Sequence, residues 1–421
     1  MASPIKEDLK RLWPLSRTFE YAAEVGLGLR MADPGAWREW DGSENRERYV
    51  LPQALGFLFL CHLEAERGPS NELLGLISEV IARADRRLLI ELEAALRCID
   101  EPGKSSESGP LPVPAGGQIG LVLPEPCLNY PGRELLFGPW LRKAIGGLHP
   151  IRIPFDPAGD RDLARVHSPA FIAGLERLAG NGGGLLTPET AVFPESPKAF
   201  RAAAGAMISA TRESRRGGRP VLVAAGPGSH HAERARAGGT CLVNNLAVAA
   251  ENALLRPDTR RVAILDLDAH HGNGSEEIFL QRPDVLTISI HAAAPFFPGT
   301  GDPDVSGEGR GRGFNMNLAV DKGESWRDAV EIAGHRLSAF APDLLLVELS
   351  TDAHRADPVS PLRADDDDFR RAGEILRDLD RPVVVELGAS GSERAWVGGL
   401  RAFLDGLLGE SRDHYDAADE I

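Results

Sequence analysis

Cysteine is scarce in this sequence, with four residues in a chain of 421, and none of them forms a Cys-x-x-Cys pair. Such scattered cysteines argue against a disulfide framework and against a cysteine-based zinc module. Long apolar runs are also missing. The run from Leu55 to Leu63 is interrupted by His62 and is too short to cross a bilayer, and the first eight residues lack the apolar core of a signal peptide. We therefore expect a cytoplasmic protein with no membrane partner.

The chain has fewer basic than acidic residues. It contains 47 Lys and Arg and 62 Asp and Glu, which give a formal net charge of −15. An acidic protein repels polyanions, so the composition argues against nucleic acid as a partner. The same charge permits the attraction of cationic substrates. At this length the chain can bury a large core and form two domains.

The pattern of apolar and polar residues changes near residue 119. Residues 1–100 carry apolar residues at helical spacing and predict a small helical N-terminal region, whereas residues 101–118 are rich in Pro, Gly and Ser and are typical of a linker. In residues 119–421, short apolar runs alternate with helical stretches, which predicts a doubly wound α/β domain with a mainly parallel sheet flanked by helices. The predicted strands are 119–122, 221–224, 262–265, 285–290, 344–348 and 383–386, and the predicted helices include 197–212, 245–255, 326–340 and 367–379.

Two acids and two histidines follow the apolar run Val262–Leu265. Such a run is expected to be a buried parallel strand, whose carboxyl end faces the ligand crevice of an open α/β sheet. Because alternate residues of a strand point the same way, Asp266, Asp268 and His270 are expected to share one face. Two carboxylates and an imidazole suit Zn²⁺ or a similar divalent ion.

Histidine pairs occur twice, at 230–231 and 270–271, each after a predicted strand, and a third polar cluster at 350–358 follows the strand 344–348. Buried imidazoles without partners are costly, so three polar clusters at strand ends indicate one site. The chemistry that fits is metal-assisted hydrolysis, in which the ion acidifies a water and a neighbouring histidine accepts its proton.

Several motifs follow one another in order within residues 119–405. They are Gly226-Pro227-Gly228-Ser229-His230-His231-Ala232, Gly239-Thr240-Cys241-Leu242-Val243-Asn244-Asn245, Asp266-Leu267-Asp268-Ala269-His270-His271-Gly272-Asn273-Gly274, Ser289-Ile290-His291, Phe297-Pro298-Gly299-Thr300-Gly301 and Asp352-Ala353-His354-Arg355-Ala356-Asp357-Pro358. As an ordered set they resemble the histone deacetylase and acetylpolyamine amidohydrolase superfamily, which has an arginase-like α/β fold. The form HHGNG at 270–274 is similar to the class II and bacterial members.

The resemblance implies a catalytic role for each matched residue. The zinc ligands would be Asp268, His270 and Asp352. The tandem catalytic histidines would be His230, as electrostatic or acid partner, and His231, as general base. Asp266 would orient His230, and Asn273 occupies the position that pairs with His231.

The resemblance also implies a structural potassium ion and an acyl-lysine tunnel. The potassium ion would be surrounded, mostly through backbone oxygens, by Asp266, Asp268, His270, Ser289 and Ile290. Phe297 would form one wall of the tunnel and Gly239 part of its floor, while Thr240 stands where the family has a phenylalanine opposite Phe297. His167 and His271 are expected to be structural.

The main departure from the family is at Ala389. The family segment that ends in Glu-Gly-Gly-Tyr corresponds to Glu386-Leu387-Gly388-Ala389, so the tyrosine that would polarise the substrate carbonyl is absent. Losing one oxyanion donor typically costs about 10²–10³ in turnover. Of the chain's four tyrosines, Tyr130 is the one we consider as a substitute, because it follows the first predicted strand, where the family has a loop at the pocket rim. The alternative, which we favour, is that Tyr130 is a surface tyrosine. Alternatively, Ala389 opens the pocket to an acyl group bulkier than acetyl. A smaller departure is Ser350-Thr351, which replaces the Gly-Phe of the family before the third ligand.

The sequence therefore predicts a zinc-dependent deacetylase or deacylase that removes an acyl group from an amine such as acyl-lysine or an acylpolyamine. A catalytically weak, metal-retaining module that binds acyl-lysine is the main alternative; Ala389 favours it, and the two retained histidine pairs argue against it. An arginase-like ureohydrolase fits less well, because such enzymes carry two manganese ions and further acidic ligands. A homo-oligomer is compatible with the sequence.

Overall fold

The computed structural model describes residues 119–131, 133, 136–320, 325–358 and 361–410. The predicted helical region 1–100 and the predicted linker 101–118 lie outside these residues. Residues 182–193 belong to a separate compact unit. In this segment β3 (Gly184–Thr187) and β4 (Thr190–Val192) pair in antiparallel fashion. The rest of the described chain belongs to the second unit, which carries the candidate site.

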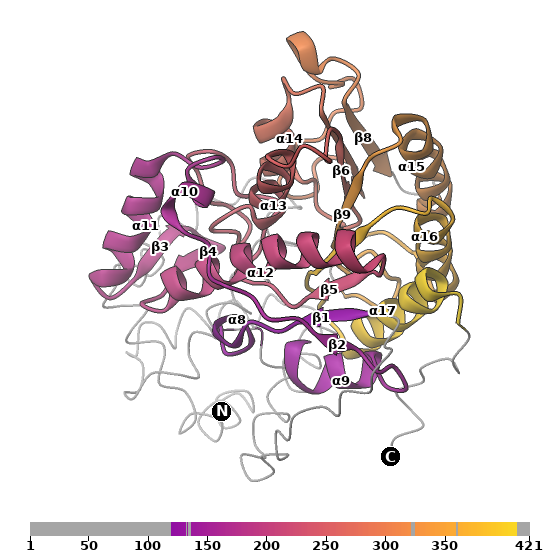
Figure 1. Ribbon diagram of the computed structural model, residues 1–421, viewed down its shortest axis with the longest axis horizontal. Coiled ribbons are helices and arrows are strands. Elements are labelled where there is room, and N and C mark those ends of the chain that lie inside the picture. The colour runs from indigo at the N-terminus through magenta and orange to yellow at the C-terminus, as the bar shows by residue number, and fades with distance from the viewer. Residues whose placement is uncertain (1–118, 132, 134–135, 321–324, 359–360, 411–421) are drawn as a thin grey trace, which may run out of the picture. The chain divides into compact units, whose positions relative to one another are not determined.

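A sheet of eight strands forms the centre of the second unit, in the order β2-β1-β5-β10-β9-β6-β7-β8 (Figure 1). Every neighbouring pair is parallel, which confirms the predicted α/β fold. Two late strands, β9 and β10, lie between β5 and β6, so they separate strands that follow each other in the chain. The strands are β1 (Gly120–Val122), β2 (Ile151–Arg152), β5 (Val221–Val223), β6 (Val262–Asp266), β7 (Val285–Ala292), β8 (Asn315–Val320), β9 (Leu344–Leu349) and β10 (Val383–Leu387).

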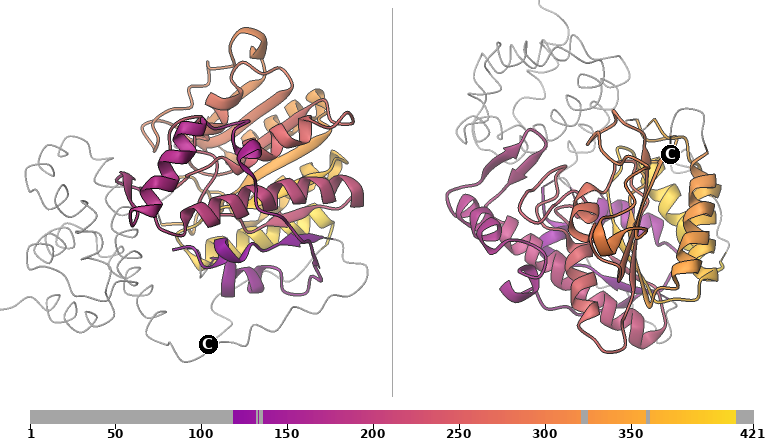
Figure 2. Two further views of the ribbon diagram at one scale, coloured as in Figure 1. Left: turned by 60° about the vertical axis from the view of Figure 1, so that its left-hand side comes forward. Right: turned by 90° about the horizontal axis from the view of Figure 1, so that it is seen from above.

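Helices cover both faces of this sheet, which explains why its central strands are continuous apolar runs. Figure 2 shows α12 (Ser196–Gly217) and α13 (Asn245–Leu254) on one face, and α15 (Trp326–Phe340), α16 (Asp366–Asp378) and α17 (Glu393–Leu408) on the other. Every residue of β6, β7, β9 and β10 is buried between these layers. The shorter helical elements are α8 (Glu125–Leu128), η3 (Leu136–Trp140), α9 (Leu141–Ala144), α10 (Asp160–Leu163), α11 (Pro169–Gly180), α14 (Asn273–Phe279) and η4 (Gly309–Gly311).

Side-chain caps explain where several helices begin. The side chains of Asn244, Ser325 and Ser392 each accept a backbone N–H from the first turn of α13, α15 and α17. Such caps satisfy amide groups that have no partner inside the helix. Among the described residues, no helix is both long enough and apolar enough to cross a membrane.

Two strands of the eight-stranded sheet, β2 and β8, were not predicted from the sequence. β2 has only two residues, too few for an apolar pattern. β8 carries Asn315 and Asn317, whose side-chain amides both donate to the Glu276 carboxylate of α14. Because the polar partner of β8 comes from another element, its sequence alone does not look like a buried strand.

His167 joins the start of α11 to the loop that follows the first histidine pair. Its Nδ1 donates to the Glu233 carbonyl at 2.9 Å, and its Nε2 accepts the Asn244 N–H at 2.9 Å. The ring is 1% exposed. Both nitrogens therefore have main-chain partners, as expected for a structural histidine, and a protonated ring would lose the bond from Asn244.

We expect His167 to make folding stability depend on pH. Burial is the main cause that lowers the pKa of His167 from 6.5 to about 4. Because the unfolded chain takes up this proton first, stability should fall as the pH falls from about 6.5 to about 4, by roughly 3 kcal/mol in total. The His167→Gln variant should be less stable than wild type at pH 7 and should lose less stability over this interval. Urea unfolding across the interval measures both slopes, and equal slopes would contradict the assignment.

Candidate metal centre

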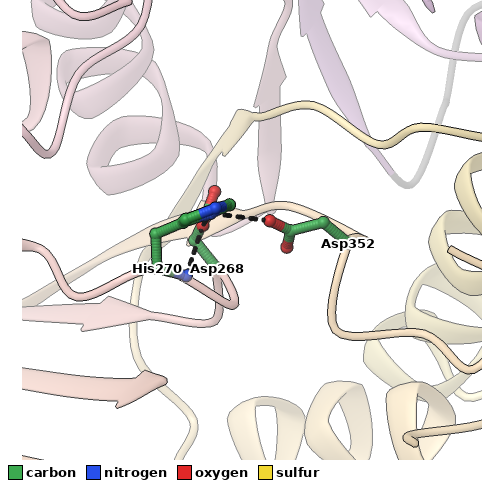
Figure 3. A group of neighbouring side chains, drawn as sticks. All are labelled: Asp268, His270 and Asp352. Carbon is green, nitrogen blue, oxygen red and sulfur yellow. Dashed lines mark hydrogen bonds and ion pairs between the residues drawn. The ribbon is translucent and has the colours of Figure 1, made fainter. Parts of the chain in front are cut away.

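Asp268, His270 and Asp352 form the candidate metal-binding group in the described part of the chain, and their side chains point toward one another (Figure 3). Each offers one ligand atom, and these atoms lie within 4.8 Å of one another. Nδ1 of His270 lies 2.7 Å from Asp268 Oδ1 and 3.0 Å from Asp352 Oδ2. Asp268 and Asp352 are buried, and His270 is partly buried. An imidazole and two carboxylates match the donor set that binds Zn²⁺ and related divalent ions.

Local turns, rather than strand alternation, bring Asp268 and His270 together. β6 ends at Asp266, and both residues lie in the loop that follows. The Asp268 N–H donates to Asp266 Oδ1, and the His270 N–H donates to Asp268 Oδ1. Carboxylates that accept an amide two residues ahead hold such turns in place. The prediction that these side chains share a strand face was therefore wrong in its cause, although Asp268 and His270 do converge.

Asp352 reaches the group from the loop after β9, which lies beside β6 in the sheet. Its Oδ1 accepts the Ala269 N–H at 2.9 Å, so the backbone between Asp268 and His270 holds it in place. The residues between positions 268 and 352 along the chain pass through β7, β8 and α15 before the chain returns. Only the insertion of β9 beside β6 makes the three residues neighbours.

The group attracts positive charge. Burial disfavours a charged His270 ring, but its bonds to Asp268 and Asp352 outweigh burial and raise the pKa of His270 to about 10. Burial and the charge of Asp268 raise the pKa of Asp352 to about 7. The positive charge of the protonated His270 ring interacts with the carboxylates of Asp268 and Asp352. A divalent cation would interact with the same two carboxylates. The residues therefore fit a bound metal ion.

The pair His230–His231 lies beside this group, with the two ring centroids 3.9 Å apart. His230 Nδ1 contacts Asp266 Oδ2 at 2.8 Å, and its Nε2 lies 3.8 Å from Asp268 Oδ2. His231 Nδ1 lies 2.8 Å from Asn273 Oδ1, and its ring centroid is 6.0 Å from that of His270. Each of the two rings is 4% exposed. His230 therefore contacts a carboxylate, whereas His231 contacts a neutral amide.

The two histidines have opposite pKa shifts. Burial opposes a charge on His230, but Asp266 and Asp268 outweigh it and raise the pKa of His230 to about 9. Burial, together with the charges of His230 and His270, lowers the pKa of His231 well below its usual value. At neutral pH one ring therefore carries a proton and the other can accept one. A pair of titratable groups with separated pKa values is typical of acid–base catalysis.

Two of the residues predicted for the substrate site, Phe297 and Gly239, lie beside His231. The Phe297 ring packs edge-on against His231, with centroids 5.2 Å apart. Gly239 has a positive φ of 52°, and a side chain there would clash with the His231 ring. Thr240, with a φ of 67°, and Ala389 are both exposed. His271 instead contacts Thr300 and Glu276, and it is not a member of the metal group.

Tyr130, the tyrosine considered as a substitute for the family's catalytic tyrosine, packs against α12. Its side chain is buried, and its hydroxyl lies 2.9 Å from Ser196 Oγ at the start of α12. Tyr130 is therefore not the surface tyrosine that the alternative interpretation expected, and its hydroxyl is engaged by α12. The other three tyrosines, Tyr21, Tyr49 and Tyr415, lie outside the described residues.

Several residues that contact the site were not found from the sequence. Glu233 accepts from the Asn273 side-chain amide at 2.9 Å and so fixes the oxygen of Asn273 toward His231. The Phe296 ring stacks on His270, with centroids 4.7 Å apart. Glu233 follows the first histidine pair in a loop, and no spacing links it to Asn273. Phe296 adjoins the predicted Phe297, which is the only sequence signal for it.

Three carboxylates lie side by side at one level of the sheet, because Asp266 pairs with Glu348 and Glu348 pairs with Glu386. Glu348 is 4% exposed and Glu386 is 1% exposed. Burial and the neighbouring carboxylates raise the pKa of Glu348 well above its usual value. The surroundings therefore favour the neutral, protonated form of Glu348 at this level of the sheet. Nothing in the sequence singles out Glu348, which lies at the end of an apolar run.

The fold and the site together define a class of proteins. They are a parallel α/β sheet that carries, at the carboxyl ends of its strands, three candidate metal ligands beside a pair of histidines. The histone deacetylase domain family matches residues 131–390, which is more than half of the chain. The chain belongs to this family.

Relatives agree with this assignment. The chain is 37% identical over 266 residues to a probable deacetylase of Methanothermobacter thermautotrophicus, covering 62% of this chain and 80% of that protein. It is 36% identical over 252 residues to a histone deacetylase-like amidohydrolase of Pseudomonas aeruginosa, covering 57% of this chain and 66% of that protein. The crystal structure of an acetylpolyamine aminohydrolase from Burkholderia pseudomallei superimposes with a TM-score of 0.61 at 26% identity, over 68% of this chain and 98% of that one.

Proposed function

We propose that this protein is a zinc-dependent amidohydrolase that removes an acyl group from an amine. The observation that carries the proposal is the placement of His230 and His231, which have opposite pKa shifts, beside the group Asp268, His270 and Asp352. A binding site alone needs neither a proton acceptor nor a proton donor at that point. Family membership and the names of the relatives support the same reaction class.

The histidines divide the proton transfers between them. His231, which is neutral at pH 7, accepts a proton from the attacking water at its Nε2, because its Nδ1 is engaged by Asn273. His230, which is protonated and held by Asp266, supplies positive charge and helps to protonate the leaving amine. General acid–base catalysis of this kind contributes about 10²–10⁴ in rate.

Asp268, His270 and Asp352 would hold the zinc ion, which supplies Lewis-acid polarisation of the substrate carbonyl and a lower pKa for water. A structural potassium ion is proposed near Asp266, Asp268, His270, Ser289 and Ile290. Support for it is the register of β6 with β7, which sets Asp266 opposite Ser289. Such an ion would offset part of the negative charge at this level of the sheet.

The substrate side of the site is proposed to be formed by Phe297, Gly239, Thr240 and Ala389. Two exposed residues, Thr240 and Ala389, stand where larger aromatic side chains are expected in the family. A more open site suits an acyl group bulkier than acetyl. The names of relatives include deacetylases and an acetylpolyamine aminohydrolase, so acylated lysine and acylated polyamines are the substrate classes to test first.

The test is a turnover assay of the zinc-loaded full chain against acyl-lysine peptides, acylpolyamines and amino-sugar amides with acyl chains of increasing length. We expect release of the free amine from at least one acyl-lysine or acylpolyamine, and its loss in the His231→Ala variant. Absence of turnover across the panel, with zinc bound, would contradict the proposal.

A catalytically weak module that binds acyl-lysine is the second candidate, and the exposed Ala389 favours it. Such a module would bind acyl-lysine peptides in a titration and release no amine. Its affinity would also be insensitive to His231→Ala, because binding needs no general base. Loss of turnover with retained peptide binding in that variant would instead favour the enzyme.

A further inference from the structure

Glu233 follows the first histidine pair, and its carboxylate hydrogen-bonds both Arg236 and Asn273. Its Oε1 accepts the Asn273 side-chain amide at 2.9 Å, and its Oε2 accepts Nε–H of Arg236 at 3.1 Å. The main chain of Glu233 is held as well, because its N–H donates to the Arg236 carbonyl and its carbonyl accepts from Nδ1 of His167, both at 2.9 Å. The side chain is 17% exposed. The carboxylate therefore has a fixed place beside Asn273.

The hydrogen bonds that connect Glu233 to His231 can run in one direction only. The carboxylate, which Arg236 contacts through both oxygens, can only accept, so Asn273 must turn its NH2 group toward Glu233. Oδ1 of Asn273 then faces His231 Nδ1, 2.8 Å away. Because an amide oxygen can only accept, Nδ1 of His231 must carry the hydrogen. In a neutral imidazole the other nitrogen, Nε2, then carries none and can accept a proton.

The opposite orientation of Asn273 would give the opposite tautomer of His231. Without Glu233, the amide can rotate by half a turn, because its oxygen and nitrogen ends are alike in shape. The rotated amide would donate to Nδ1 and leave the hydrogen of the neutral ring on Nε2, where no further proton can then be accepted. With Glu233 in place, the same rotation would set the amide oxygen against a carboxylate. Two acceptors repel each other, so Glu233 excludes this orientation.

We propose that Glu233 is a positioning residue that selects the tautomer of the general base His231 through Asn273. Partners that fix the tautomer of a metal-ligating histidine typically change activity by about 10–100-fold when they are replaced, and we expect a similar factor here. The effect on turnover rests on the proposed function, in which His231 accepts the proton of the attacking water. The tautomer itself is a property of the site that can be measured without turnover.

The first test reads the tautomer of His231 by ¹⁵N NMR of the histidine-labelled, zinc-loaded full chain at neutral pH. The signals of His231 are assigned by their loss in His231→Ala. In the wild-type chain we expect a hydrogen on Nδ1 and none on Nε2. In Glu233→Ala we expect both tautomers, because the Asn273 amide is free to rotate. A wild-type chain with the hydrogen on Nε2, or an unchanged tautomer in Glu233→Ala, would overturn the inference.

Glu277→Ala is the matched control for this measurement. Glu277 is an exposed residue of α14, and its carboxylate accepts the Arg234 N–H at 3.1 Å, so it contacts the same loop as Glu233. The variant removes a carboxylate from this loop but leaves the bond between Glu233 and Asn273 in place. It should keep the wild-type tautomer. A change as large as in Glu233→Ala would mark a general effect on the loop and would also overturn the inference.

The second test measures kcat and KM for Asn273→Asp in two backgrounds. Glu233→Ala alone should lower kcat about 10–100-fold and leave KM unchanged. Adding Asn273→Asp should restore most of this kcat, because both oxygens of a carboxylate accept and its rotation no longer matters. In the wild-type background Asn273→Asp should lower kcat instead, because it sets a second carboxylate where the amide nitrogen lies 2.9 Å from Glu233 Oε1. Each kcat is taken at the pH optimum of the variant, since a carboxylate beside His231 also raises its pKa.

The sign of the effect of Asn273→Asp decides the outcome. An equal effect in both backgrounds would overturn the inference, as would a wild-type kcat in Glu233→Ala or a loss that Asn273→Asp does not restore. Rescue supports the inference and excludes misfolding of Glu233→Ala, because Asn273→Asp would not repair a misfolded chain. Absence of turnover in the wild-type chain, with the expected tautomers in the NMR measurement, would overturn the proposed function and leave the positioning of His231 standing.

Discussion

Replacing Asp268 or His270 with alanine is expected to abolish both metal binding and turnover. Each substitution removes one of three ligand atoms that lie within 4.8 Å of one another. Each also leaves a buried partner uncompensated, because His270 Nδ1 lies 2.7 Å from Asp268 Oδ1. Two remaining ligands hold a divalent ion far more weakly than three. Without the ion, neither the water nor the carbonyl is activated, so the loss of turnover should reach the background rate.

Two measurements test this prediction: metal content by elemental analysis, and the rate of amine release from the preferred substrate. The adjacent His271 offers a matched control, because its ring contacts Thr300 and Glu276 and is not in the metal group. His271→Gln should keep the bound metal, although it is expected to lower the midpoint of thermal unfolding. Full activity in a metal-free Asp268→Ala/His270→Ala double variant would remove the hypothesis of metal-assisted hydrolysis.

The Ala389→Tyr variant should turn over acetyl-lysine substrates about 10²–10³ times faster than the wild-type chain. This factor is the usual contribution of one oxyanion-hole donor to the turnover rate. Ala389 is exposed at the end of β10, so the larger side chain has room. Its backbone is fixed by Ser350 Oγ and the Thr351 N–H, so the new side chain would start from a defined position. Steady-state rates on acetylated peptides measure the gain.

Ala389→Phe separates the hydroxyl group from the bulk of the ring. If the gain comes from a donor to the substrate carbonyl, phenylalanine at this position should give none of it. A gain that is equal in both variants would point to packing of the substrate instead. No gain with tyrosine, together with fast wild-type turnover of a longer acyl chain, would contradict an impaired site and would favour an enzyme of altered specificity.

Much of the fold could be predicted from the sequence because its signals are local. The predicted helix 326–340 agrees with α15 because Ser325 caps its first turn, and the predicted strand 344–348 differs from β9 by one residue. Strand β8 was missed because its alternate asparagines bond Glu276, which is distant in the chain. Helix α12 is longer than the predicted 197–212, because it continues to Gly217 and ends at Gly218 with a φ of 63°.

The sequence alone determined the types of chemical groups in the site. Asp268 and His270 are two residues apart, so a short loop is enough to bring them together, and the apolar run before them predicts the strand end. The tertiary structure decided which distant residues join them. Because β9 and β10 lie between β5 and β6, the residues Asp352, Ser350 and Ala389 reach the same strand ends as the first histidine pair.

The two histidines at 230 and 231 show most clearly where sequence information ends. They are adjacent and chemically identical, and nothing in their local sequence assigns them different roles. In the fold, one ring contacts the Asp266 carboxylate and has a raised pKa, while the other contacts the Asn273 amide and has a lowered pKa. A pKa depends on burial and on neighbouring charges, which come from other elements. The sequence therefore determined that imidazoles are present, and only the tertiary structure decided which one holds a proton.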